Sequence, residues 1–182
     1  MKEYTITRYS FTELDEKARE KAIEKARHDL YVNMPEEFIS IPLEEKLSEL
    51  IPNADLRLRY DLSYSQGSGL SFTGTITREG APDFAWPDKA IRVNIGSATH
   101  HYCHAFTMTY EFLDEDYEEV NADAKVFREQ IVSVCHELEK YGYRLIEAES
   151  SEETAIAYLT DMEEVFLSDG TISFPLGEKV SA

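Results

Sequence analysis

The second half of this sequence contains very few basic residues. Residues 92–182 carry 19 Asp or Glu and only 6 Lys or Arg, a local net charge of −13, in a 182-residue chain of formal net charge −18. Two segments contain no base at all: 111–123, with seven acids, and 145–178, with nine. Charge this one-sided destabilises a compact fold by self-repulsion, so it calls for a functional reason. It also argues against nucleic acid or an anionic membrane as a direct ligand, because both are polyanions.

The sequence also has little cysteine, glycine and proline, and no long apolar run. Two cysteines in a chain without an apolar leader predict reduced thiols in a cytoplasm. No apolar run approaches the length that spans a membrane. Hydrophobic residues still make up 42 % of the chain, which is enough for a packed core, and no low-complexity tract is present. We therefore expect a soluble, cytoplasmic, globular protein.

Hydrophobic periodicity predicts a first short strand, then helices on both sides of a central run of strands. Strands are expected over 3–9, 55–64, 70–77, 90–95 and 105–113. Helices are expected over about 12–30 with Thr12 as the N-cap, 38–50 with a kink at Pro42, and 123–141 ended by Gly142. A further helix is expected within 146–159, started near Ser150 or Ser151, followed by a hairpin over 165–174. No βαβ alternation is visible. The sequence therefore predicts an α+β fold in which helices pack mainly on one face of an antiparallel meander.

The length fits one domain. Within it we expect an N-terminal helical part over about 10–52, a sheet over about 54–113, and C-terminal helices with a hairpin over about 121–176.

A cluster of histidines with a cysteine lies at 100–104, which reads His-His-Tyr-Cys-His. Zinc uses such ligands, but on an extended segment His100 and His104 lie roughly 13 Å apart and cannot share an ion. The opposite face of the segment supplies only two ligands. Cys135 falls on the apolar stripe of a predicted helix, where a core thiol is expected. We therefore expect no metal and no other cofactor.

The loop from Ser65 to Gly69 reads Ser-Gln-Gly-Ser-Gly. It lacks the lysine of a phosphate-binding loop and does not lead into a helix, and no G-x-S-x-G nucleophile motif occurs in the chain. Two glycines between alternating runs are typical of a hairpin turn. We therefore expect that the protein is not an enzyme. The alternative that stays open is a small hydrolase or metal-dependent enzyme that uses this loop together with the cluster from His100 to His104.

The acid runs have two explanations, a solvated face or a surface that binds a basic partner. A solvated face is the usual explanation for a charge run. Here the acids lack compensating bases and are interleaved with aromatic residues, and a helix would place Glu149, Glu152 and Glu153 on one side within about 6 Å. Rows of carboxylates resemble the phosphates of a nucleic acid and attract a groove rich in Arg and Lys. The candidate partner-binding residues are Asp114, Glu115, Asp116, Tyr117, Glu118, Glu119, Glu149, Glu152, Glu153, Asp161, Glu163 and Glu164.

Three segments carry a family resemblance: 9–22 (YSFTELDEKAREKA), 64–74 (YSQGSGLSFTG) and 101–104 (HYCH). They resemble the opening helix, the S-Q-G-x-G-x-x-F-x-G element and the H-Y-x-H element of a family of phage and prophage proteins that mostly lacks an assigned function. At Ser68 the family often has Asp, so an activity that depends on that Asp would be missing here. The segments cover about a sixth of the chain and exclude its acidic C-terminal part. The resemblance implies a phage origin.

A small, strongly acidic phage protein is similar in character to anti-CRISPR and anti-restriction proteins, which resemble nucleic acid electrostatically. By this analogy we expect an inhibitor that binds a host nucleic-acid-binding defence enzyme in the host cytoplasm. The leading candidate is a CRISPR–Cas nuclease whose DNA or PAM site the acids would occupy. An antitoxin-like or scaffold protein of a phage is a further alternative.

Overall fold

The computed structural model describes residues 7–97, 103–121, 123–161 and 165–173, and its contacts divide the chain into two compact units. Residues 36–145 form one unit, which we call the sheet unit. Residues 1–35 and 146–182 form the other, which we call the terminal unit. Each unit is described by itself. None of the described helices combines the length and the apolar character that a membrane-spanning helix needs.

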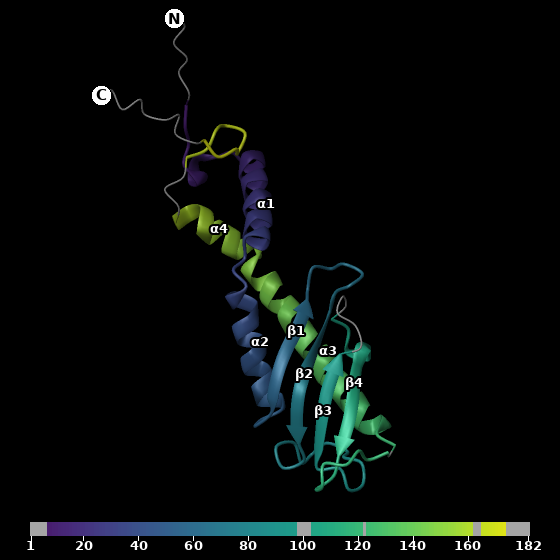
Figure 1. Cartoon of the computed structure of the whole chain (residues 1–182). Coiled ribbons are helices and arrows are strands. Elements are labelled where there is room, and N and C mark those ends of the chain that lie inside the picture. The colour runs from purple at the N-terminus through teal and green to yellow at the C-terminus, as the bar shows by residue number, and fades with distance from the viewer. Residues whose placement is uncertain (1–6, 98–102, 122, 162–164, 174–182) are drawn as a thin grey trace, which may run out of the picture. The chain divides into compact units, whose positions relative to one another are not determined.

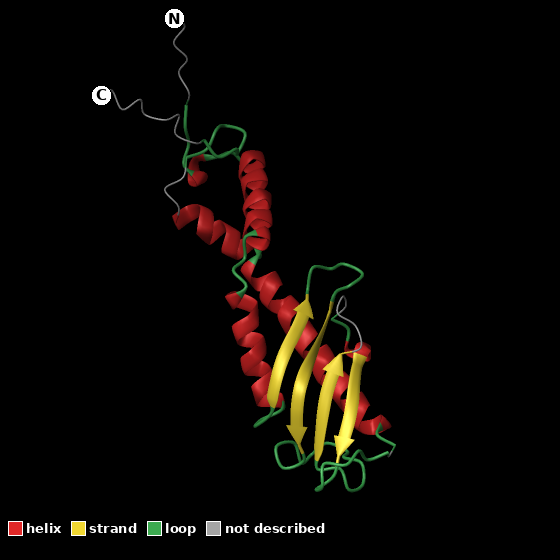
Figure 2. Cartoon of the chain, in the orientation of Figure 1, coloured by secondary structure: helices red, strands yellow, loops and turns green. Residues whose placement is uncertain are grey.

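The sheet unit contains a four-stranded antiparallel meander (Figure 2). Its strands, in the order in which they pair, are β1 (Asp55–Asp61), β2 (Gly69–Thr77), β3 (Arg92–Ser97) and β4 (Met108–Leu113). The register places Leu58 opposite Phe72, and Val93 opposite Phe112. Side chains alternate between the faces of a strand, so these four apolar residues share one face.

Two helices cover the apolar face of the sheet, α2 (Glu37–Leu50) and the long helix α3 (Lys125–Glu149), as Figure 1 shows. Phe127, Ile131 and Leu138 of α3 are fully buried. The Phe127 ring packs edge-on against Phe112 of β4, with ring centroids 5.2 Å apart. Helices on one face of an antiparallel sheet confirm the α+β fold that the sequence predicts.

The prediction that Gly142 ends the second long helix is wrong, because α3 continues to Glu149. Gly142 is needed instead for close packing. A Cβ at this position would lie 2.5 Å from Cδ1 of Leu62 and 3.6 Å from the methyl groups of Leu43. The glycine therefore lets the main chain of α3 approach α2 and the end of β1, which is a tertiary requirement that helical periodicity does not reveal.

The terminal unit is built around α1 (Glu16–Val32) and α4 (Glu152–Asp161). Small residues of α1, Ala18, Ala22 and Ala26, recur every four positions and are buried. They share one core with Ala155 and Leu159 of α4. Phe11, Leu14 and Phe166 complete that core.

Several predicted boundaries of the elements differ from those in the structure. Asp15, not Thr12, caps α1 by accepting the N–H of Ala18 at 2.8 Å, after a 3-10 turn, η1 (Phe11–Glu13). The strand predicted over 105–113 is a 3-10 turn, η2 (Ala105–Thr107), followed by the shorter β4. The hairpin near the C-terminus is confirmed as a bridge between Phe166 and Ile172. Most of the strand predicted over 3–9 lies outside the described residues.

Candidate partner-binding surface

The acidic residues 114–119, which we call the acidic turn, follow directly after β4. Asp114 Oδ1 accepts the N–H groups of Asp116 and Glu118, each at 3.0 Å. The main chain closes the same loop, since the N–H of Asp114 donates to the carbonyl of Glu118 and that of Tyr117 to the carbonyl of Asp114, both at 3.1 Å. Next to the turn, the N–H of Val120 donates to Phe112 at 2.8 Å. The acidic turn therefore has a fixed main-chain conformation, which the side chain of Asp114 stabilises.

The other residues of the acidic turn point into solvent. Glu115, Asp116, Glu118 and Glu119 are all exposed. Tyr117 is 65 % exposed and has a positive φ of 63°. Its ring lies 5.3 Å from the guanidinium of Arg92 on β3, a cation–π contact that orients the ring. The turn thus presents four carboxylates around one oriented aromatic side chain.

The described part of the chain contains four ion pairs, and each of them uses a lysine. Their acids are Asp29, Glu49, Glu129 and Asp169, and none belongs to the acidic turn. None of the carboxylates of the turn is therefore paired with a described base, although the guanidinium of Arg92 against the Tyr117 ring adds one positive charge beside them. Four exposed carboxylates beside one base still leave an excess of negative charge, which attracts cationic partners through its summed field.

The second acidic segment is not the single helical row that the sequence predicts. Glu149 is the last residue of α3, and Glu152 and Glu153 open α4 after a break at residues 150–151. Ser151 causes the break by capping α4, because its Oγ accepts the N–H of Thr154 at 3.1 Å. Glu152 and Glu153 occupy the first helical turn, where the helix dipole already favours acids.

Glu152, Glu153 and Asp161 are exposed, and Glu149 is half-buried. The predicted residues Glu163 and Glu164 lie outside the described residues. The acids of this segment belong to the terminal unit and the acidic turn belongs to the sheet unit. We therefore treat the acidic turn alone, without the acids of the second segment, as the candidate partner-binding surface.

The two elements of the alternative enzymatic site meet in the structure. A Cβ on Gly69 would lie 2.9 Å from Nδ1 of His104, so the imidazole packs directly on this glycine. The loop serines are engaged locally: Ser68 Oγ accepts the N–H of Ser65 at 2.7 Å, and Ser65 Oγ accepts that of Gly67 at 3.3 Å. These bonds support the predicted turn. His100 and His101 lie outside the described residues.

Metal-ligating side chains do not gather elsewhere in the described segments, where no group of three His, Cys, Asp or Glu could hold an ion. The predicted core position of Cys135 is confirmed, since the residue is fully buried. Burial raises the pKa of its thiol to about 12. This thiol is therefore protonated at neutral pH and is a poor ligand or nucleophile.

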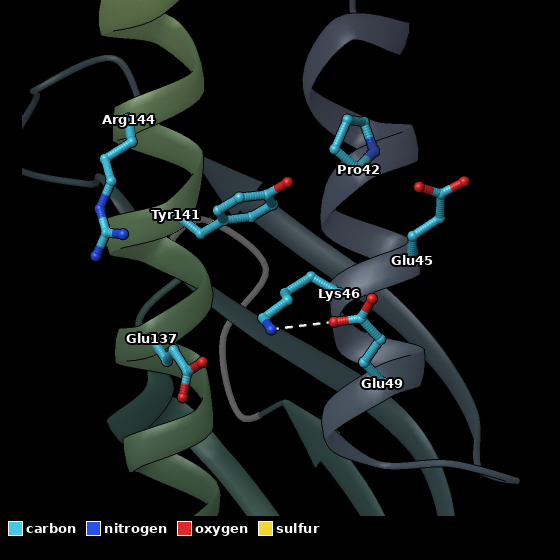
Figure 3. A pocket seen from close by; sticks show the side chains of 7 residues that line it. All are labelled: Pro42, Glu45, Lys46, Glu49, Glu137, Tyr141 and Arg144. Atoms are coloured by element: carbon cyan, nitrogen blue, oxygen red, sulfur yellow. Dashed lines mark hydrogen bonds and ion pairs between the residues drawn. The ribbon is translucent and has the colours of Figure 1, made fainter.

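A cavity of about 390 Å³ lies between α2 and α3 (Figure 3). Its walls carry three glutamates, Glu45, Glu49 and Glu137, against Lys46 and Arg144. Lys46 Nζ lies 3.0 Å from Glu49, and this hydrogen bond, with a smaller contribution from the charge of Glu137, raises the lysine pKa. Most of the charge in this cavity is compensated locally, unlike that of the acidic turn.

Sequence reasoning missed the structural role of Asp114 and the contact between Arg92 and Tyr117. Asp readily accepts hydrogen bonds from N–H groups two residues later, so the run Asp114-Glu115-Asp116 contained a signal for the structural role of Asp114. The contact between Arg92 and Tyr117 depends on strand pairing across the sheet and had no local signal. The cavity between α2 and α3 likewise requires the packed helices.

Comparison with known proteins adds no relative: no protein-family model, curated protein or solved structure matches the chain.

Proposed function

We propose that this chain is a non-catalytic, phage-encoded inhibitor that binds a basic, nucleic-acid-binding defence enzyme of the host. The leading candidate for that enzyme is a CRISPR–Cas nuclease. The acidic turn would contact Arg and Lys side chains that otherwise hold DNA phosphates or read the PAM. A protein bound there blocks DNA by occupying its site.

One observation carries this proposal: the acidic turn combines a fixed main chain with four exposed carboxylates that form no ion pair in the described part of the chain. A rigid set of charges loses less conformational entropy on binding than a flexible tail. Tyr117 adds an exposed aromatic side chain, a residue type that often anchors protein interfaces. Charge, rigidity and an anchor together favour a binding surface over a merely solvated face.

The test compares charge reversals that change the net charge equally. In one variant Glu115 and Asp116 are replaced by lysine; in the control, Glu20 and Glu24, which are exposed on α1, are replaced in the same way. Both proteins are assayed for binding to a purified CRISPR nuclease and for inhibition of its DNA cleavage, at low and high salt. We expect the first variant to lose binding by tenfold or more and the control by about twofold, because close charge pairs contribute far more than distant ones.

Equal losses in the two variants would show that only the bulk charge matters and would refute the acidic turn as the contact surface. No binding of the unaltered protein to a basic nuclease at low salt, combined with no recovery of one from a bacterial lysate, would refute the proposed function itself.

The enzymatic alternative is supported by one contact, the packing of His104 on Gly69. Metal analysis of the purified protein and a hydrolase screen of His104→Ala against the unaltered chain test it. A bound zinc ion, or an activity that this variant abolishes without unfolding, would favour the enzyme over the inhibitor.

A further inference from the structure

We propose that β4 binds an extended peptide segment as a fifth strand of the sheet, with apolar side chains directed toward α3 and basic side chains toward the opposite face. The addition of a strand goes beyond the proposed function. The preference for basic side chains in that strand rests on the proposed function, because the proposed function assumes a basic partner.

The first step is the edge of β4 that faces away from β3, which the bridge between Leu113 and Glu119 covers at one end and which is unpaired at Tyr110 among the described residues. This strand is the last in the sheet order, and Figure 2 shows it at one edge. The carbonyl of Phe112 accepts the N–H of Val120 on the side away from β3. Main-chain groups alternate in direction along a strand, so the N–H and C=O of Tyr110 also point away from β3. Among the described residues, no main-chain group pairs with them on that side.

The second step is the groove beside this edge. A cavity of about 440 Å³ is lined by Met108 and Tyr110 of β4, by Phe106 of η2, and by Val132 and Arg128 of α3. Phe106 is 79 % exposed, an unusual position for a large apolar side chain. An unpaired strand edge next to an apolar groove is the geometry in which peptides add to sheets, because main-chain hydrogen bonds supply affinity and the groove takes alternate side chains.

The third step is the charge on the two faces of the added strand. The cavity is lined by one base, Arg128, and by no acid. The guanidinium of Arg128 lies 5.5 Å from the Tyr110 ring centroid and disfavours a basic side chain on this face. The opposite face of β4 presents exposed Glu111, whose Oε2 accepts Nδ2 of Asn94 at 2.9 Å, with the acidic turn beyond it. The fitting peptide therefore alternates apolar and basic residues.

The experiment uses two synthetic peptides of identical composition, acetyl-Lys-Val-Lys-Val-Lys-Val-Lys-amide and acetyl-Lys-Lys-Lys-Lys-Val-Val-Val-amide. Their charge is the same, and only the first alternates. Binding to the full chain is measured by isothermal titration, and amide hydrogen exchange is followed by NMR. We expect the alternating peptide to bind about tenfold more tightly, the effect of burying one apolar side chain of this size. Binding of the alternating peptide should slow amide exchange at Tyr110 and leave amide exchange at Glu111 unchanged, because the main chain of Glu111 already bonds to β3.

Two substitutions of the same kind on α3 locate the groove. Val132→Lys places a second cation in the cavity, whereas Val126→Lys changes a 57 % exposed valine that does not line it. The first should remove the preference for the alternating peptide, and the second should keep it. Phe106→Ala, at an exposed position, should weaken the preference without affecting folding, so the test does not depend on Val132→Lys being stable.

Equal binding of both peptides, without protection of Tyr110, would overturn the strand addition and leave the proposed function intact. Selective binding that Val132→Lys and Phe106→Ala do not alter would also overturn it. Failure of both peptides to bind at low salt would count against both proposals.

Discussion

Substitutions of Asp114 can separate the effect of the main-chain conformation of the acidic turn from the effect of its charge. Its Oδ1 accepts two main-chain N–H groups, each at 3.0 Å. In Asp114→Asn the side-chain oxygen can still accept both, although the charge is lost. In Asp114→Ala both the charge and the two acceptor contacts are lost. The two variants therefore have the same net charge and differ only in what holds the turn together.

The magnitude follows from the two hydrogen bonds. Each contributes about 0.5–1.5 kcal/mol net, so Asp114→Ala should lose about 1–3 kcal/mol in the free energy of unfolding relative to Asp114→Asn. Urea denaturation measures this difference. Amide exchange at Asp116 and Glu118 should rise in the alanine variant alone, because their N–H groups lose their acceptor.

Binding to a basic nuclease then shows whether affinity depends on the fixed conformation of the turn or on its charge alone. If the fixed turn matters, Asp114→Ala weakens binding more than Asp114→Asn, and Asp114→Asn resembles Glu115→Gln, which also removes one charge. Identical stability and affinity of the alanine and asparagine variants would refute the reasoning, because the turn would then not depend on this side chain.

Three further predictions concern stability and reactivity. Gly170→Ala should destabilise the protein by about 2 kcal/mol in thermal or urea unfolding, since φ is 79° there and a Cβ would collide with the carbonyl of Ala18; an unchanged stability would contradict this. In a Cys103→Ser background, which removes the other, half-buried free thiol, the Cys135 thiol, with its pKa raised to about 12 by burial, should react with DTNB at pH 8 only after unfolding; rapid reaction of that native variant would contradict the burial of Cys135. Hydrogen bonding by Lys21 lowers the pKa of Asp169, so this carboxylate stabilises the fold above its unfolded pKa of about 4 and loses that effect as pH falls below it; Asp169→Asn should reduce the acid-induced loss of stability, as measured by unfolding between pH 2 and 7.

The fold class was predictable because it depends on local periodicity. The alternation of Leu56, Leu58 and Tyr60 predicted β1, and the apolar stripe of Phe127 and Ile131 predicted α3. Such patterns record which side of an element faces the core, and each can be read within a few residues. The same reasoning placed Cys135 in the core.

The boundaries of the elements were less predictable, since a glycine or serine has several roles. Gly142 resembles a helix end in sequence, but it lies inside α3 where Leu62 leaves no room for a Cβ. The start predicted near Ser150 or Ser151 is confirmed, because Ser151 caps α4, whereas residues 146–149 belong to α3 and not to that helix. The contact that decided the role of Gly142 comes from a residue far away in the chain, whereas the cap made by Ser151 is a local contact three residues on.

The sequence by itself determined the excess of negative charge, the absence of bases from 111–123 and 145–178, and the α+β pattern, because composition and periodicity are properties of the linear chain. Only the tertiary structure decided what those charges can do. It made residues 114–119 into a turn held by Asp114 and separated Glu149 from Glu152 and Glu153 by a helix break. It also left the main chain of Tyr110, on the outer edge of β4 beside a groove, unpaired among the described residues. The physical reason is that charge is additive along a sequence, whereas a binding surface requires main-chain hydrogen bonds and packing between residues far apart in it.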